Sequence, residues 1–293
     1  MCIRDRVLIF DRDVRITNQD LTPVSPATDG RAELIFAQRG GRTAMVRSLV
    51  TAPMTLVRPF QLRDGRLLVP MMTLGPGLCS HDVVRIRIVV EAGAGVLVTT
   101  TAATRVLSMQ PGAHAEQHVE IDAAPGAHVE YYPAVTIPFP GSAFAQTVRV
   151  RAAAGARVGV METWALGRTA RSEYLEFQSL SNRTTLHVDD ELVYADATEL
   201  RPEADPLAGA GILAGRRYLA TGFWYGATLA DEPQEGAAGG DLLIAAAQSR
   251  PDVVFLRALA SDAPALDARL TRMTARIAAA WGRDPVPLDR FRC

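Results

Sequence analysis

The chain has 293 residues, of which 48% are apolar, and its formal net charge is -1. This length and apolar content allow a sizeable core, which excludes an intrinsically disordered protein. All 31 basic residues are arginine, but acidic residues balance them, so nucleic acid is not an expected partner.

No apolar run approaches the roughly 20 residues that span a bilayer, so no membrane segment is expected. The three cysteines, Cys2, Cys79 and Cys293, are odd in number and widely spaced, which predicts no disulfide framework and suits the reducing cytoplasm. The opening residues lack the apolar stretch of a secretory signal. We expect residues 1–30 to be a poorly ordered or non-native lead-in and residues 31–293 to form a single β domain.

The chain after the lead-in begins with predicted strand pairs. Glu33–Ala37 and Thr43–Leu49 are expected to be strands joined by a tight turn at Arg39–Arg42. Two further apolar strands are expected on either side of an Asp-Gly hairpin signal, at Met54–Val57 and Leu67–Met71.

A recurring motif organises the middle of the sequence. Three times, a β-branched strand is followed by a short turn rich in alanine and glycine and by a second strand that starts near a valine. The glycines Gly93, Gly126 and Gly155 occupy the same turn position, 33 and 29 residues apart. Glycine at a fixed turn position indicates a backbone with positive φ, and self-similarity at this spacing is typical of stacked, solenoid-like β structure.

The segments that follow the repeats are also predicted to be mainly strands. Tyr174–Gln178 and Thr184–Val188 are expected to form an antiparallel pair around a turn at Ser181-Asn182. A loop is expected at Arg201–Gly215 and a strand at Tyr218–Tyr225.

The C-terminal part changes character. Leu242–Gln248 is predicted to be a short helix and Val253–Leu259 a strand. Over residues 262–282, five apolar residues recur on one helical face, which predicts an amphipathic helix packed on the sheet: Leu266, Leu270, Met273, Ile277 and Trp281. The predicted fold is therefore mainly β, a β-helix-like scaffold of stacked antiparallel strands with two short C-terminal helices.

Alternating polar residues give one candidate metal face. His114, Glu116 and His118 share one side of a predicted strand. Imidazole and carboxylate suit nickel or zinc, although a solvated strand face produces the same pattern. A second cluster, Cys79, His81 and Asp82, lies on a predicted loop. These residues could bind a metal, or Cys79 and His81 could form a nucleophile and its base; the alternative is an ordinary loop with a half-buried cysteine.

Glu162 lies within an apolar strand. A buried carboxylate must find a partner or shift its pKa, so Glu162 is a functional candidate; the alternatives are an outward-facing position or an ion pair with Arg168. The sequence contains no Gly-rich phosphate loop, no nucleophile elbow and no Cys-x-x-Cys, so its motifs do not predict an enzyme.

The order of several motifs resembles the UreD (UreH) family of urease accessory proteins, here in diverged form. The similar segments are Arg39–Thr43, Pro76–Asp82, Val90–Arg105, Tyr132–Phe139, Glu162–Arg168 and Val253–Ala260. The resemblance implies a non-catalytic scaffold that binds urease apoprotein, recruits UreF and the UreG GTPase, and holds no stable cofactor while nickel passes through it. It allows for a homodimer within the accessory complex.

The resemblance also suggests which residues meet the metal. Asp82, Glu130 and Glu162 are the candidates for a nickel path. Val135 and Pro140 replace carboxylates of the family pattern, so a scaffold that has lost nickel transfer is one alternative. Another is a small cupin-like metalloenzyme that uses the histidine face.

Overall fold

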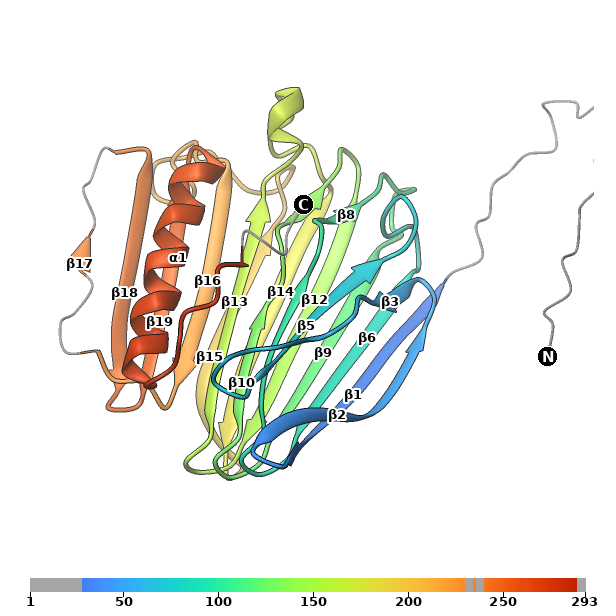
Figure 1. The fold of residues 1–293 in the computed structure, drawn as a ribbon. Coiled ribbons are helices and arrows are strands. Elements are labelled where there is room, and N and C mark those ends of the chain that lie inside the picture. Colours follow the sequence, from blue (N-terminus) through green and yellow to red (C-terminus); the bar gives the residue numbers. More distant parts are fainter. Residues whose placement is uncertain (1–27, 230–233, 236–239, 289–293) are drawn as a thin grey trace, which may run out of the picture.

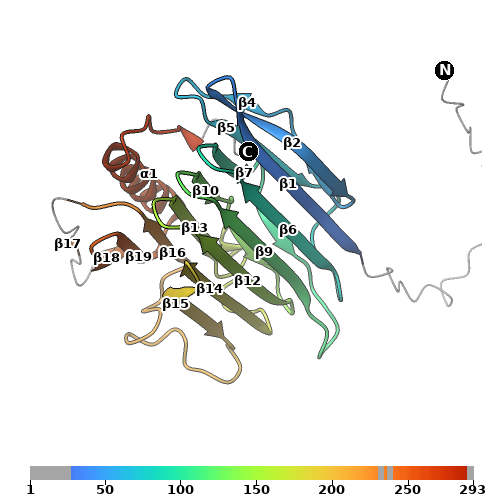
Figure 2. The same cartoon turned by 90° about the horizontal axis from the view of Figure 1, so that it is seen from below.

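The computed structural model describes residues 28–229, 234–235 and 240–288, which form two stacked β-sheets and one helix. Figures 1 and 2 show the two sheets as layers, with the helix outside one of them. The seven-stranded sheet contains, in spatial order, β15 (Glu191–Leu200), β14 (Ser179–Val188), β12 (Ala143–Ala152), β9 (Ala115–Ala123), β6 (Val83–Val90), β1 (Asp29–Arg39) and β2 (Arg42–Thr51).

The second sheet has twelve strands. Its main path is β17 (Gln234–Glu235), β18 (Leu242–Arg250), β19 (Val253–Ala260), β16 (Tyr218–Tyr225), β13 (Arg157–Ala165), β10 (His128–Tyr132), β7 (Gly95–Thr100), β5 (Leu67–Thr73) and β3 (Met54–Leu56). Short strands join this path at its side: β4 (Phe60–Gln61), β8 (Thr104–Val106) and β11 (Thr136–Pro138).

Each copy of the predicted repeat forms one coil of the solenoid, with one strand in each of the two sheets. In each copy the chain crosses from the seven-stranded to the twelve-stranded sheet through a four-residue turn, and the turn glycines Gly93, Gly126 and Gly155 have φ of 72°, 69° and 77°. The second strands start in exact register, with the Cα of His128 opposite Gly95 on one side and Arg157 on the other. The solenoid-like prediction is confirmed.

Two details of the strand prediction are wrong. The stacked central strands are parallel, not antiparallel, because each coil returns in the same direction before the next strand is laid down; antiparallel pairs occur toward the two ends of each sheet. Ser181-Asn182 is not a turn but part of β14, which pairs along its whole length with β12, and Tyr174–Gln178, the expected partner of Thr184–Val188, is not a strand. Asn182 points into the interior and hydrogen-bonds there, so its turn propensity is overridden.

The main core lies between the sheets. In β6 the side chains of Val84, Ile86 and Ile88 are buried while Arg85 and Arg87 are exposed, as the alternation predicted. The same inward alternation continues in β9 and β12, which makes one continuous apolar layer between the two sheets.

The C-terminal helix covers the outer face of the twelve-stranded sheet. Helix α1 (Ala263–Ala280) is capped by Asp262, whose carboxylate accepts a hydrogen bond from the backbone N–H of Ala265 at 2.9 Å. The predicted apolar stripe from Leu266 to Trp281 is buried against this sheet. No described helix is long and apolar enough to cross a membrane.

The predicted short helix at Leu242–Gln248 is wrong, since this segment is strand β18. It pairs with β19, and Ile244 and Ala246 alternate with more exposed neighbours. The alanine-rich run has good helix propensity, but packing against α1 on one face selects the strand. Strand β1 begins at Asp29, so the last two residues of the predicted lead-in belong to the sheet, whereas residues 1–27 lie outside the described residues.

Candidate functional site

A polar cluster interrupts the apolar layer between the sheets. Glu162 of β13 points into this layer and is 3% exposed. On the facing sheet, Gln117, Gln146 and Asn182 lie side by side at the same register of β9, β12 and β14. The coil thus stacks three amides opposite one buried carboxylate.

The amides and a hydroxyl donate toward this carboxylate. Gln117 donates to the side-chain oxygen of Gln146 at 2.9 Å, and Gln146 donates both to Glu162 and to the Asn182 side-chain oxygen at 3.1 Å. The second carboxylate oxygen accepts from Asn182 Nδ2 at 3.2 Å and from Thr184 Oγ1 at 3.3 Å. Glu162 is therefore hydrogen-bonded without being neutralised.

The charge state of Glu162 follows from this environment. Burial raises its pKa to about 7, against the lowering effect of the hydrogen bonds from Asn182, Gln146 and Thr184. The predicted partner Arg168 instead forms an ion pair with Glu173, and no ion pair to Glu162 occurs among the described residues. A carboxylate in this state can bind either a proton or a cation near neutral pH.

Glu130 lies on the opposite face of the same sheet. Its carboxylate accepts from the Arg66 guanidinium and lies 2.9 Å from His128 Nε2. Arg66 is 2% exposed and also binds Asp64 Oδ2 at 2.7 Å and the carbonyl oxygen of Asp284 at 2.7 Å. Burial lowers the pKa of His128, which favours the neutral imidazole. Glu130 is thus one member of a buried charge cluster that ties β5 and β10 to the chain after α1.

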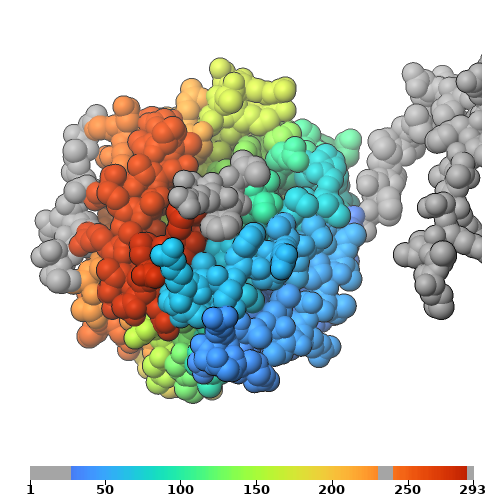
Figure 3. All heavy atoms as spheres, viewed as in Figure 1, coloured from blue at the N-terminus to red at the C-terminus, as the bar shows by residue number. Residues whose placement is uncertain are grey.

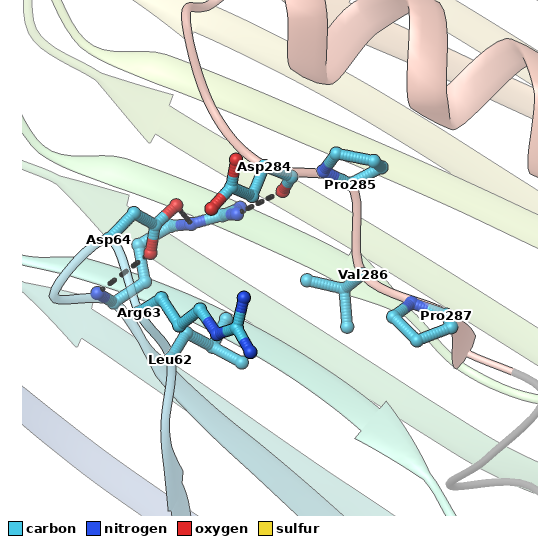
Figure 4. Close-up of a pocket in the computed structure, with 8 residues that line it drawn as sticks. Leu62, Arg63, Asp64, Asp284, Pro285, Val286 and Pro287 are labelled. Carbon is cyan, nitrogen blue, oxygen red and sulfur yellow. Dashed lines mark hydrogen bonds and ion pairs between the residues drawn. The ribbon is translucent and has the colours of Figure 1, made fainter.

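A pocket of about 520 Å³ opens beside this cluster. Figure 4 shows the side chains of Leu62, Arg63 and Asp64 on one side and residues 284–287 on the other. Figure 3 shows the same two parts of the chain, cyan and red, meeting on one face of the molecule. The pocket is lined by both apolar and charged residues. The guanidinium of Arg66 donates to Asp64, Glu130 and Asp284, so these hydrogen bonds do not point into the open space of the pocket.

Asp82, the third residue of the predicted nickel path, organises its own loop. One carboxylate oxygen accepts from the backbone N–H of Thr28 at 2.8 Å and the other from Cys79 N–H at 2.7 Å. Burial and the nearby Asp82 raise the pKa of Cys79, which disfavours the thiolate that a nucleophile or metal ligand requires. The two hydrogen bonds to Asp82 hold the loop against the chain at Thr28.

His81 provides a stability prediction. Its φ is 65°, a left-handed conformation in which a Cβ is strained. We expect His81→Gly to raise the free energy of unfolding by about 0.5–1 kcal/mol, because the relief of strain exceeds the added chain entropy of glycine. Urea unfolding measures the difference. Ser80→Gly, at a neighbour without positive φ, is the matched control and should destabilise the chain; equal effects of the two variants would contradict the argument.

The predicted histidine face forms on the outside of the seven-stranded sheet. Glu116 bridges the two imidazoles, with Oε1 2.9 Å from His114 Nε2 and Oε2 2.8 Å from His118 Nε2, while His118 Nδ1 lies 2.9 Å from Thr147 Oγ1. Hydrogen bonds to both histidines lower the pKa of Glu116. Within the described ranges, no group of three or more histidine, cysteine or acidic side chains is arranged to hold a metal ion.

The three path candidates are not brought together. Asp82 lies in a loop, and Glu130 and Glu162 lie on opposite faces of one sheet. The nickel path stays a prediction. Neither Asp82 nor Glu162 has a basic partner in the described structure, but Asp82 is bound by two backbone N–H groups, whereas Glu162 lies between the sheets. Sequence reasoning missed Arg66 and the amides. Gln117 and Gln146 are 29 residues apart, the same offset as Gly126 and Gly155, and this signal could have found them.

This chain is similar to known proteins over nearly its whole length. The family model described as UreD urease accessory protein matches residues 28–293. The urease accessory protein UreD of Deinococcus radiodurans is 36% identical over 250 residues, covering 84% of this chain and 90% of that protein.

Two further relatives carry similar names. Urease accessory protein UreD 1 of a Synechococcus strain is 37% identical and covers 69% of this chain and 75% of its own length. Urease accessory protein UreD 2 of Streptomyces griseus is 35% identical, covering 69% of this chain and 71% of that protein. These names describe accessory factors rather than catalysts, and they overturn the alternative of a small cupin-like metalloenzyme. The chain belongs to the UreD family and is an accessory protein of urease, not an enzyme.

Proposed function

We propose that this protein is a scaffold and chaperone for urease maturation, which binds urease apoprotein, recruits UreF and the UreG GTPase, and lets nickel pass toward the urease active site. Family membership supports the maturation role. The partners and the nickel step follow from the resemblance of its motifs to those of the family.

The proposal that nickel passes through this protein rests on one observation, the buried carboxylate of Glu162, which has no basic partner in the described structure. A divalent cation is attracted to a carboxylate whose charge is not already balanced, and amide and hydroxyl oxygens are further ligands it accepts. Thr184 places its hydroxyl oxygen next to Glu162, whereas Gln146 and Asn182 turn their amide nitrogens toward it, so these two amides would rotate to offer their oxygens to a cation. Glu130 is less suited, since the Arg66 guanidinium already balances its charge. With a pKa of about 7, Glu162 exchanges a proton for a cation at small cost near neutral pH.

The test is co-expression of this chain with the urease subunits, UreF and UreG of one source, in medium with and without nickel. A tagged wild-type chain should co-purify with UreF and urease apoprotein and yield active urease when nickel is present. Glu162→Gln keeps the shape of the side chain and removes its negative charge. We expect this variant to retain the complex and to lower urease activation about tenfold or more, because a neutral amide binds a divalent cation poorly.

Glu120→Gln is the matched control, because Glu120 is a half-exposed carboxylate on the outer face of the seven-stranded sheet. It should leave both the complex and the activation unchanged. Absence of any complex with the wild-type chain would reject the maturation role. A complex without activation would favour a scaffold that has lost nickel transfer, and the triple change Ala134→Gln, Val135→Glu and Pro140→Asp should then restore some activity.

A further inference from the structure

Strand β2 ends the seven-stranded sheet, and most of its outer edge is open. Figure 2 shows β2 beyond β1 at the margin of the sheet. At its start, the backbone N–H of Thr43 donates to the carbonyl oxygen of Gly65 at 2.9 Å. Beyond Thr43, no described strand pairs with this edge. A strand in this position presents a row of backbone N–H and C=O groups that another chain can pair with.

This edge carries unbalanced positive charge. Five exposed arginines lie on β2, at the end of β1 and in the loops before and after β4, and together we call them the basic edge: Arg39, Arg42, Arg47, Arg58 and Arg63. None of the five forms an ion pair with a described residue. Two carboxylates near this edge already pair with other arginines, Glu33 with Arg31 at 3.0 Å and Asp64 with Arg66 at 2.7 Å.

The opposite end of the same sheet is different. Strand β15 carries three acidic residues, and each is matched by an arginine of this chain: Glu191 by Arg250, Asp196 by Arg257 and Glu199 by Arg201. Isolated charges often protect an edge strand from unwanted pairing. β2 also exposes two apolar side chains, Val46, which lies at the bulge in the pairing with β1, and Leu49; they are 44% and 40% exposed. Apolar and basic groups together describe a surface for binding.

We propose that the basic edge is a docking surface for an extended acidic segment of a partner protein, which adds to β2 as a further strand. Strand addition satisfies the open backbone groups, the apolar side chains of the segment cover Val46 and Leu49, and its carboxylates pair with Arg42 and Arg47. Opposite charge across such an interface selects the partner and speeds association. A nucleic acid backbone would engage the same arginines, but it would leave the backbone row and both apolar side chains unused.

This surface lies at one end of the sheet and does not depend on the role of Glu162. Its test uses a fluorescein-labelled peptide of about ten residues that alternates Asp or Glu with Val or Thr, with binding followed by fluorescence anisotropy on the full chain. A second peptide has the same sequence with N-methyl groups on alternate amides, which keeps the charge and blocks strand pairing. We expect N-methylation to weaken binding about tenfold or more, since strand addition takes its affinity from backbone hydrogen bonds.

The paired variant Arg42→Glu/Arg47→Glu reverses the charge at the two arginines of the basic edge that lie on β2. It should weaken binding of the first peptide about tenfold or more, because attraction becomes repulsion at two contacts. The matched control Arg183→Glu/Arg272→Glu changes the net charge equally at two exposed arginines of β14 and α1 and should stay within about twofold. Circular dichroism verifies that both variants are folded.

Four results would overturn the proposal. They are no binding by the wild-type chain, equal losses in the two paired variants, equal affinity for the N-methylated peptide, and equally tight, Arg42/Arg47-dependent binding of a labelled dT10 oligonucleotide. The last would identify a nucleic acid surface instead.

Discussion

Replacing Arg66 with methionine is expected to lower the free energy of unfolding by about 3–5 kcal/mol, the usual cost of removing one partner of a buried ion pair. Methionine keeps most of the side-chain volume but leaves the carboxylate of Glu130 without its cation. It also removes the donors that hold Asp64 and the carbonyl oxygen of Asp284. Urea or thermal unfolding of the purified chain measures the loss.

The double variant Arg66→Met/Glu130→Gln separates the charge effect from the packing effect. It should be more stable than Arg66→Met alone, because the uncompensated charge at the more deeply buried carboxylate, Glu130, is removed. Arg63→Met is the control on the neighbouring exposed arginine and should change stability by less than about 0.5 kcal/mol. If both arginines prove equally costly to replace, the buried cluster does not anchor the chain after α1.

The stability difference between Glu162→Gln and the wild-type chain is expected to depend on pH. The pKa of Glu162 is about 7 in the folded chain, above the ordinary 4.5, so the folded state holds this proton more tightly than the unfolded state. The resulting stabilisation is fully present below pH 4.5 and is lost as the pH rises through 7. Between pH 5 and pH 8 the difference should shift by about 2.5 kcal/mol in favour of the glutamine variant.

Urea unfolding of both proteins at pH 5, 6, 7 and 8 provides the measurement, and the comparison at each pH cancels groups other than Glu162. The shift should begin near pH 5 and level off above pH 7, following the two pKa values. A difference that is flat over this range would mean that the carboxyl titrates alike in folded and unfolded chains. The donors of Gln146, Asn182 and Thr184 would then fully offset burial.

Local patterns in the sequence were enough for much of the fold. The glycines at 93, 126 and 155 require positive φ, and alternation in Val84–Ile88 reports which face is buried; both are properties of single segments. Strand direction is not such a property. Whether β9 lies parallel to β6 depends on where the chain goes between them, so the parallel stacking was missed.

The site could be predicted only in part for the same reason. A glutamate in an apolar strand is visible in the sequence, and Glu162 is indeed buried. Its surroundings come from three strands of the opposite sheet, and nothing local to Gln146 or Asn182 marks these amides as its partners. Arg66 shows the same limit, because an arginine after an Asp-Gly turn is normally exposed and only the distant Glu130 and Asp284 explain its burial.

The in-register glycine turns have an architectural consequence. Every passage from the seven-stranded to the twelve-stranded sheet within the coil takes four residues, whereas the return connections, such as those between Thr100 and Ala115 and between Ala165 and Ser179, are long and irregular. One rim of the molecule is therefore uniform and the other is free to vary. Duplicating one coil at the uniform rim would widen each sheet by one strand, about 4.8 Å, without changing the register of its neighbours. Each added coil thus lengthens the scaffold by the same amount, while the long connections at the other rim can change in sequence and length independently.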